Sequence, residues 1–123
     1  MTPEMTTRRG DFDILSTPAL LQSIETTAKE YLGRAVPAGW DSVGTFVELR
    51  HQGPAALGQE FTVALQTTGS SGARVPFTCT VSARTGQLAE ARHDRALIEV
   101  ARYVRRLARS LGDPAVADST PSA

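Results

Sequence analysis

Three residues of this chain, a threonine, a glutamate and a histidine, have the side-chain types that acid–base chemistry needs. Glu25 follows Thr17 by eight residues in a segment with helical periodicity, and His51 ends a later apolar segment. A carboxylate held against hydrocarbon loses hydration, which disfavours its charged form and suits it to proton transfer. An imidazole exchanges protons near neutral pH, so His51 is a natural partner for it. These residues are our candidates for a catalytic site.

The helix that must hold Thr17 and Glu25 is predicted over residues 17–32, where apolar residues recur at intervals of three and four. We interpret Thr17 as the N-cap and Pro18 as the first helical residue, and we expect Gly33 to end the helix. Thr17 then projects into the middle of the apolar stripe, and Glu25 lies on its edge roughly 12 Å further along the axis. The alternative is that Thr17 is only a cap and that Glu25 turns outward or pairs with an arginine.

A sheet must cover this helix, because four strand-like segments follow the Gly/Pro-rich loop at residues 33–41. Hairpin-type connections between them predict an antiparallel meander. One helix and one antiparallel sheet bury their apolar faces on each other, which predicts an α+β domain. The four segments are residues 43–51, 60–68, 74–84 and 87–100. In the first of these, the residues expected on the inward face are Val43, Thr45, Val47, Leu49 and His51.

The length and charge of the chain bound its organisation. The sequence has 123 residues, which suit one domain, and its 13 basic and 13 acidic residues give no indication of a nucleic-acid partner. The single cysteine, Cys79, excludes an intramolecular disulfide and a cysteine-rich zinc site, and we interpret it as a buried apolar residue. We expect neither a metal nor a cofactor.

The two ends of the sequence are polar. No signal segment and no apolar run of membrane-spanning length is visible, so we expect a cytoplasmic protein without a membrane partner. Residues 1–11 are expected to be flexible, residues 12–109 to form the single domain, and residues 110–123, which are small, polar and proline-containing, to form a disordered tail.

Three segments together resemble one enzyme family. LSTPALLQSIETTA (residues 15–28), SVGTFVELRHQGPAALGQEFTV (residues 42–63) and ARHDRALI (residues 91–98) resemble the fluoroacetyl-CoA thioesterase family of hotdog-fold enzymes, over about residues 12–107. The resemblance implies a hotdog domain, in which a curved antiparallel sheet wraps one long helix, with the first N-terminal strand missing or shortened. It also implies hydrolysis of acyl thioesters.

The resemblance extends to site residues, because the spacing from Thr17 to Arg95 matches the family pattern without a gap. In that family the matching threonine, glutamate and histidine form the catalytic triad, which carries over onto Thr17, Glu25 and His51. The matching glycine and arginine line the acyl site, which carries over onto Gly44 and Arg95. The family further implies a homodimer with sites at the subunit interface, and a tetramer is a further option.

The chain departs from the family before its helix. Fluoroacetyl-specific enzymes carry a longer N-terminal stretch, with a strand and phenylalanines that close over the small acyl group. Here 16 residues precede Thr17, with no alternating strand and one aromatic residue, Phe12. We therefore expect a larger acyl group than fluoroacetyl, delivered on coenzyme A or on an acyl carrier protein. Trp40 either supplies a replacement wall or packs on the helix.

Other interpretations stay open at the level of the sequence. The same shell would suit a non-hydrolytic acyl-binding protein, or a dehydratase or hydratase that uses His93 and Asp94. Arg95 would in the simplest case be a salt-bridge partner of an acid. A cone-shaped isomerase fold also suits the length, although it typically has several helices before its sheet. A helical C-terminus would gather four arginines on one side, either as a solvated face or as a cradle for coenzyme A phosphates or an acidic carrier protein: Arg102, Arg105, Arg106 and Arg109.

Overall fold

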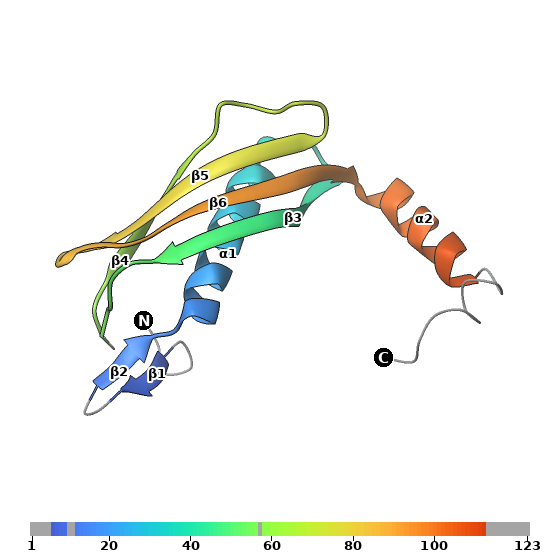
Figure 1. Ribbon diagram of the computed structural model, residues 1–123. Coiled ribbons are helices and arrows are strands. Elements are labelled where there is room, and N and C mark those ends of the chain that lie inside the picture. Colours follow the sequence, from blue (N-terminus) through green and yellow to red (C-terminus); the bar gives the residue numbers. More distant parts are fainter. Residues whose placement is uncertain (1–5, 10–11, 57, 113–123) are drawn as a thin grey trace.

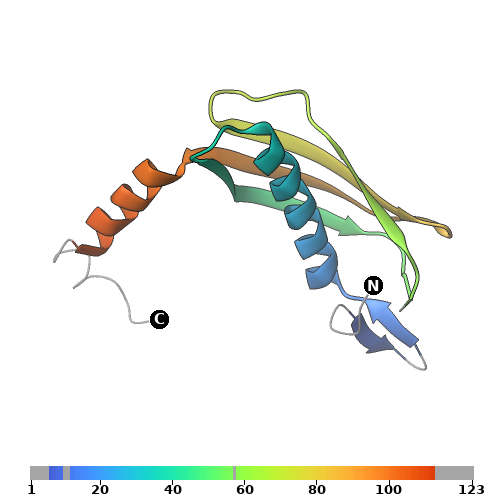
Figure 2. The ribbon, with the colours of Figure 1, turned by 180° about the vertical axis from the view of Figure 1, so that it is seen from behind.

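The computed structural model describes residues 6–9, 12–56 and 58–112, and it confirms an α+β architecture (Figure 1). Helix α1 (Thr17–Ala35) crosses one face of a four-stranded antiparallel sheet, as the reverse view also shows (Figure 2). The strands of this sheet are β3 (Trp40–His51), β4 (Phe61–Gln66), β5 (Arg74–Ala83) and β6 (Gly86–Glu99).

The strand order β3-β6-β5-β4 corrects the predicted meander, because β3 pairs with β6 and not with β4. After β3 the chain is held against β6, where the amides of Gln52 and Gly53 both donate to the carbonyl of Leu88. The chain then continues to the opposite edge of the sheet, where β4 begins. Strand β3 is consequently an edge strand of this sheet in the described chain.

The core forms between α1 and the sheet. Leu20, Ile24, Ala28 and Leu32 repeat every four residues and are the buried residues of α1. They pack with a row of apolar side chains from β5 and β6, among them Val75, Phe77, Cys79, Val81 and Leu88. The helix passes Gly33 and ends at Ala35, later than predicted. Pro37 explains this end, because a following proline holds Val36 in the extended conformation that it adopts (φ −100°, ψ 152°).

The N-cap of α1 is Ser16, one residue before the predicted cap. Its backbone is extended and its side-chain oxygen accepts a hydrogen bond from the amide of Ala19 at 3.3 Å. Thr17 is therefore the first helical residue and Pro18 the second. This shift of one residue leaves the hydroxyl group of Thr17 available for a contact outside the helix.

A β-bulge in β3 corrects the predicted alternation. Gly44 pairs with Arg95 and Phe46 with Asp94, so Thr45 is the extra residue. A bulge of one residue exchanges the two faces of a strand. Before the bulge the helix-facing positions are Ser42 and Gly44, and the prediction for Val43 and Thr45 was wrong. After the bulge, Val47, Leu49 and His51 lie on the helix-facing side of the strand, as predicted.

A short hairpin precedes α1, where the first N-terminal strand was expected to be missing or shortened. Strands β1 (Thr6–Arg9) and β2 (Phe12–Leu15) pair antiparallel in a sheet of their own. The Leu15 amide donates to the carbonyl of Ala55 at 2.8 Å, which ties the hairpin to the segment after β3. Residues 1–5 and 10–11 of the expected flexible N-terminus lie outside the described residues.

The C-terminal segment forms helix α2 (Val100–Gly112), which leaves the end of β6 and extends away from the sheet (Figure 1). Its residues 110–112 had been assigned to the tail, and the rest of the predicted tail lies outside the described residues. The four arginines face away from an exposed apolar stripe that includes Tyr103, Val104 and Leu107. No helix in the described ranges has the length and apolar character to cross a membrane.

Replacing Ser16 and Thr17 separately tests the assignment of the cap. Ser16→Ala should lower the free energy of unfolding by about 1 kcal/mol, because an amide in the first turn of α1 loses its acceptor. Thr17→Val retains the cap and should change stability by less than about 0.5 kcal/mol. Urea unfolding followed by circular dichroism measures both values. A larger loss for Thr17→Val than for Ser16→Ala would return the cap to Thr17.

Cys79 gives the stability of the fold a dependence on alkaline pH. It is 3% exposed, as predicted for a small apolar residue, and burial raises the pKa of its thiol from 9.0 to about 11. Between these two values the unfolded chain ionises this thiol and the folded chain does not, so the free energy of unfolding should fall as the pH rises. Urea midpoints at pH 8, 9 and 10.5 should therefore fall more steeply for the unmodified chain than for Cys79→Ala. Parallel curves would refute this expectation.

Candidate active site

Two of the predicted site residues are in direct contact. A hydrogen bond of 2.8 Å joins Oγ1 of Thr17 and Nδ1 of His51. Thr17 reaches the ring because Ser16 caps the helix, and His51 reaches it as the last residue of β3. The bond has two tautomeric forms: either the hydroxyl donates to Nδ1, or Nδ1–H donates to the hydroxyl oxygen. In the first form Nε2–H is left to donate to a ligand, and in the second the hydroxyl group is left to donate.

This pair lines an open pocket of about 390 Å³ between the start of α1 and the N-terminal hairpin. The first-turn amides of a helix carry partial positive charge, which suits the pocket to a developing negative charge. Thr17 and His51 are both exposed, although Thr17 lies on the same face of α1 as the buried Leu20. The described residues that line the pocket are Thr7, Ile14, Leu15, Ser16, Thr17, Pro18 and His51.

Glu25 lies elsewhere on α1, beside a buried arginine. It is half-buried, two turns along the helix from Thr17, and it is not among the described residues that line the pocket. Burial lowers the pKa of the Arg95 guanidinium from its ordinary value, and the negative charges of Glu25 and Asp41 partly oppose this effect. Glu25 therefore acts electrostatically on Arg95, without forming a direct ion pair with it among the described residues.

Arg95 belongs to a buried polar cluster with Ser42 and His93. Its Nε donates to Oγ of Ser42 at 2.8 Å, Nη2 donates to the Ser42 carbonyl oxygen at 3.0 Å, and Nη1 lies 3.1 Å from Nε2 of His93. The salt-bridge interpretation of Arg95 does not hold within the described chain, because its direct partners are a serine and a histidine and not a carboxylate. These partners were not foreseen from the sequence.

Gly44 lies against this cluster. A Cβ atom at this position would stand 3.3 Å from Cε1 of His93 and 3.4 Å from Nη1 of Arg95, which is tighter than ordinary packing. The missing side chain therefore makes room for His93 and Arg95, and any role in approaching a ligand is additional to this one. Glu25, Gly44 and Arg95 form a second group of predicted site residues.

The two groups are separated along β3. Gly44 and His51 are seven residues apart on one strand, which corresponds to roughly 20 Å in extended backbone. On α1, eight residues separate Thr17 from Glu25, or roughly 12 Å of helix. One chain thus holds the predicted site residues in two groups, which we term partial sites. The hydroxyl–imidazole pair lies at one end of β3 and the carboxylate–guanidinium group toward the other.

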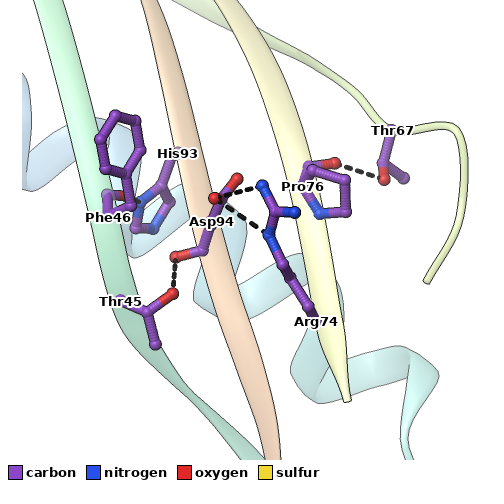
Figure 3. A network of polar contacts seen from close by, with 7 residues as sticks. All are labelled: Thr45, Phe46, Thr67, Arg74, Pro76, His93 and Asp94. Carbon is purple, nitrogen blue, oxygen red and sulfur yellow. Dashed lines mark hydrogen bonds and ion pairs between the residues drawn. The ribbon is translucent and has the colours of Figure 1, made fainter. Parts of the chain in front are cut away.

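His93 and Asp94, the pair considered for a dehydratase, lie on opposite faces of β6. The ring of His93 is buried against β3, whereas Asp94 reaches Arg74 on β5, with an ion pair of 2.7 Å (Figure 3). The sequence contained a signal for this that was missed. Successive side chains of a strand point to opposite faces, so His93 shares a face of β6 with Arg95 and not with Asp94. A dehydratase that pairs these two side chains is not supported by this geometry.

Trp40 begins β3 and is 42% exposed. It is paired in register with Glu99 at the end of β6, where the amide of Val100 donates to the Gly39 carbonyl at 2.9 Å. It therefore lies at the junction of β3 with α2. The idea that it forms a wall of the acyl site stays a prediction.

Comparison with solved structures shows the hotdog fold. The chain is 26% identical to a hot-dog-like protein from Thermanaerovibrio acidaminovorans (TM-score 0.76, covering 81% of this chain and 74% of that one). A Thermus thermophilus protein described as a thioesterase superfamily member is 21% identical (TM-score 0.77, 88% and 82%). The fluoroacetyl-CoA-specific thioesterase FlK, also solved with fluoroacetate and CoA, is 17% identical (TM-score 0.76, 97% and 88%).

Comparison at the level of sequence identifies the family. No curated protein gives a significant match to the chain. The family model described as fluoroacetyl-CoA-specific thioesterase, however, matches residues 1–101, which is most of the sequence and includes all five predicted site residues. The chain therefore belongs to the fluoroacetyl-CoA-specific thioesterase family of hotdog proteins.

Proposed function

We propose that this protein hydrolyses acyl thioesters, and that the reaction takes place between the two partial sites described above. The observation that carries the proposal is the 2.8 Å bond between Thr17 and His51 at the start of α1, in a chain of a thioesterase family. A thioester needs an activated nucleophile and a stabilised oxyanion more than it needs help for its leaving group. The Thr17–His51 pair offers a hydrogen-bond donor for the oxyanion in either tautomer.

Glu25 either activates the nucleophile of the reaction or is itself the nucleophile. As a general base it takes a proton from water, whose oxygen then attacks the carbonyl carbon of the thioester. The carbon–sulfur bond breaks, and the thiolate receives a proton as the free acid leaves. As a nucleophile, Glu25 instead attacks the same carbon and expels the thiolate, which gives a mixed anhydride. Water then cleaves this anhydride, which releases the free acid and restores the carboxylate of Glu25. Both routes require the carboxylate of Glu25 and the imidazole of His51 to flank one substrate carbonyl.

A second copy of the chain is proposed to bring the two partial sites together. Strand β3 presents an edge that is unpaired in the described chain, and such edges favour pairing with another strand. Antiparallel pairing of β3 with the partner's β3 about Glu48, with Thr45 left out of the pairing as it is against β6, places Gly44 opposite the partner subunit's His51. Glu25 and Arg95 of one protomer then face the partner's Thr17, and the pairing covers side chains that are exposed in the single chain.

The substrate proposed is an acyl group other than fluoroacetyl, carried as an acyl-CoA thioester. The hairpin of β1 and β2 contributes only Thr7, Ile14 and Leu15 to the pocket among the described residues, so the pocket stays open. Family membership and the solved complex of FlK with coenzyme A support this carrier. The arginines of α2 would also suit the phosphates of coenzyme A or the acidic surface of an acyl carrier protein.

Replacing Glu25 by glutamine tests the chemical proposal. Glu25→Gln retains the shape of the side chain and removes its basicity, so thiol release from a panel of acyl-CoA thioesters should fall by about 10²- to 10⁴-fold. Glu30→Gln is the matched control, because Glu30 is exposed on the same helix, and its rate should equal that of the unmodified chain. Binding of acyl-CoA without any turnover by the unmodified chain would instead indicate an acyl-binding protein.

Mixing two inactive variants tests whether the site is shared between subunits. Glu25→Gln and His51→Ala should each be inactive alone. After unfolding and refolding together, each mixed dimer would keep one intact site, and about a quarter of the unmodified activity should return. If Glu25 and His51 of the same chain act together, every site in the mixture carries a defect and the activity stays absent.

A further inference from the structure

The cluster of Ser42, His93 and Arg95 contains the only buried polar side chains among the described residues, with exposures of 4, 1 and 4%. The function proposed above places Arg95 beside Glu25 and gives no role to His93. Nδ1 of His93 lies 2.7 Å from the carbonyl oxygen of Phe46, and its Nε2 lies 3.1 Å from Nη1 of Arg95. Both ring nitrogens are therefore engaged by groups of the protein.

The chemistry of these partners determines the form of the ring. A guanidinium group has only donors, so Nε2 of His93 must accept from Arg95 and carry no proton. A carbonyl oxygen can only accept, so Nδ1 must carry the proton that is donated to Phe46. The two requirements agree on one species, the neutral Nδ1–H tautomer. A doubly protonated ring would set its Nε2–H against a second donor, Nη1 of Arg95.

The bulge in β3 helps to create this arrangement. Thr45 is the extra residue, and its hydroxyl group donates to the carbonyl of Asp94 at 3.2 Å, beside the point where Phe46 meets His93 (Figure 3). Gly44, just before the bulge, has no side chain that could displace the His93 ring or the Arg95 guanidinium group. A buried ring with both nitrogens engaged has no access to a substrate proton, so His93 is not suited to act as a base.

We infer that His93 is a positioning residue, which holds the Arg95 guanidinium beside Gly44 through its neutral Nδ1–H tautomer. Three of the five guanidinium N–H groups are used by Ser42 and His93, and the remaining two are not used by the described residues. The fixed guanidinium therefore presents two donors of defined direction to an acyl group. Only this last step rests on the proposed function, because the tautomer and the contacts do not depend on it.

Nitrogen-15 NMR of histidine-labelled protein at pH 7 tests the tautomer without any activity. His93 should show a slowly exchanging proton on Nδ1 and the chemical shift of an unprotonated Nε2, and a His93→Gln sample assigns the signals. A proton on Nε2 would contradict the inference, because that nitrogen could then not accept from Arg95. His51 in the same sample serves as an exposed histidine for comparison.

Kinetics of variants at His93 and Arg95 test the positioning role. His93→Leu should lower kcat/KM by about tenfold, mainly through KM, because a guanidinium donor loses its acceptor. His93→Gln should recover part of this loss, since its amide oxygen can accept from Arg95. In an Arg95→Lys background, His93→Leu should add less than about a twofold loss. The inference would be overturned if the losses from His93→Leu and Arg95→Lys multiply, or if His93→Gln recovers nothing. If His93→Leu does not fold, His93→Gln is tested in the unmodified and the Arg95→Lys backgrounds.

Arg92→Gln is the matched control for these variants, because Arg92 is exposed on the opposite face of β6 and should leave kcat/KM unchanged. The proposed hydrolysis and the positioning role of His93 can be refuted separately. Absence of thiol release by the unmodified chain would remove the proposed hydrolysis, and the NMR result would still decide whether His93 holds Arg95. The wrong tautomer in an active enzyme would remove only the role of His93.

Discussion

The extended backbone of β3 keeps two sets of predicted site residues apart, and the proposed shared site depends on this separation. A strand cannot fold back on itself, so Gly44 and His51 are held at fixed positions roughly 20 Å from each other. Helix α1 repeats the separation, with Thr17 over one end of the strand and Glu25 two turns further on. A reaction that needs all of them therefore needs a second strand running in the opposite direction.

Each set is built by a small local feature of the backbone. Ser16 caps α1 and leaves the hydroxyl of Thr17 for His51, so the first set depends on a shift of one residue at a helix start. The bulge at Thr45 and the missing side chain of Gly44 make room for the second set, in which Arg95 is buried with neutral partners. A buried guanidinium is costly unless its donors are used, and Ser42 and His93 use three of the five.

Sequence patterns predicted the features that depend on periodicity and missed those that depend on single residues. The buried stripe of α1 and the strand-like segments follow from intervals of four and two, and both were recovered. The bulge was missed because Thr45 continues the alternation from Val43 to Val47 without a visible break. Strand β3 was paired with β4 because hairpins are the commonest connection. The helix end was placed at Gly33, although Pro37 determines it by restricting Val36.

The candidate site was predicted as five residues without their grouping. Thr17 and His51 do meet, but nothing local in the sequence could indicate that Glu25 acts electrostatically on Arg95, because that interaction joins a helix to a strand seventy residues away. His93 and Arg95 share a face through simple alternation, so this relation was available from the sequence and was overlooked. What the sequence could not indicate is that one chain holds these five residues in two separate groups.

A crystal structure with a non-hydrolysable thioether analogue of an acyl-CoA would test the shared site most directly. The quantity to measure is the distance from the Glu25 carboxylate to the imidazole of His51 in the same chain and to that of the partner subunit's His51. The account predicts that Glu25 and the partner's His51 flank one bound carbonyl group, with the two strands β3 paired. A monomer, or a ligand held between Glu25 and His51 of a single chain, would contradict it.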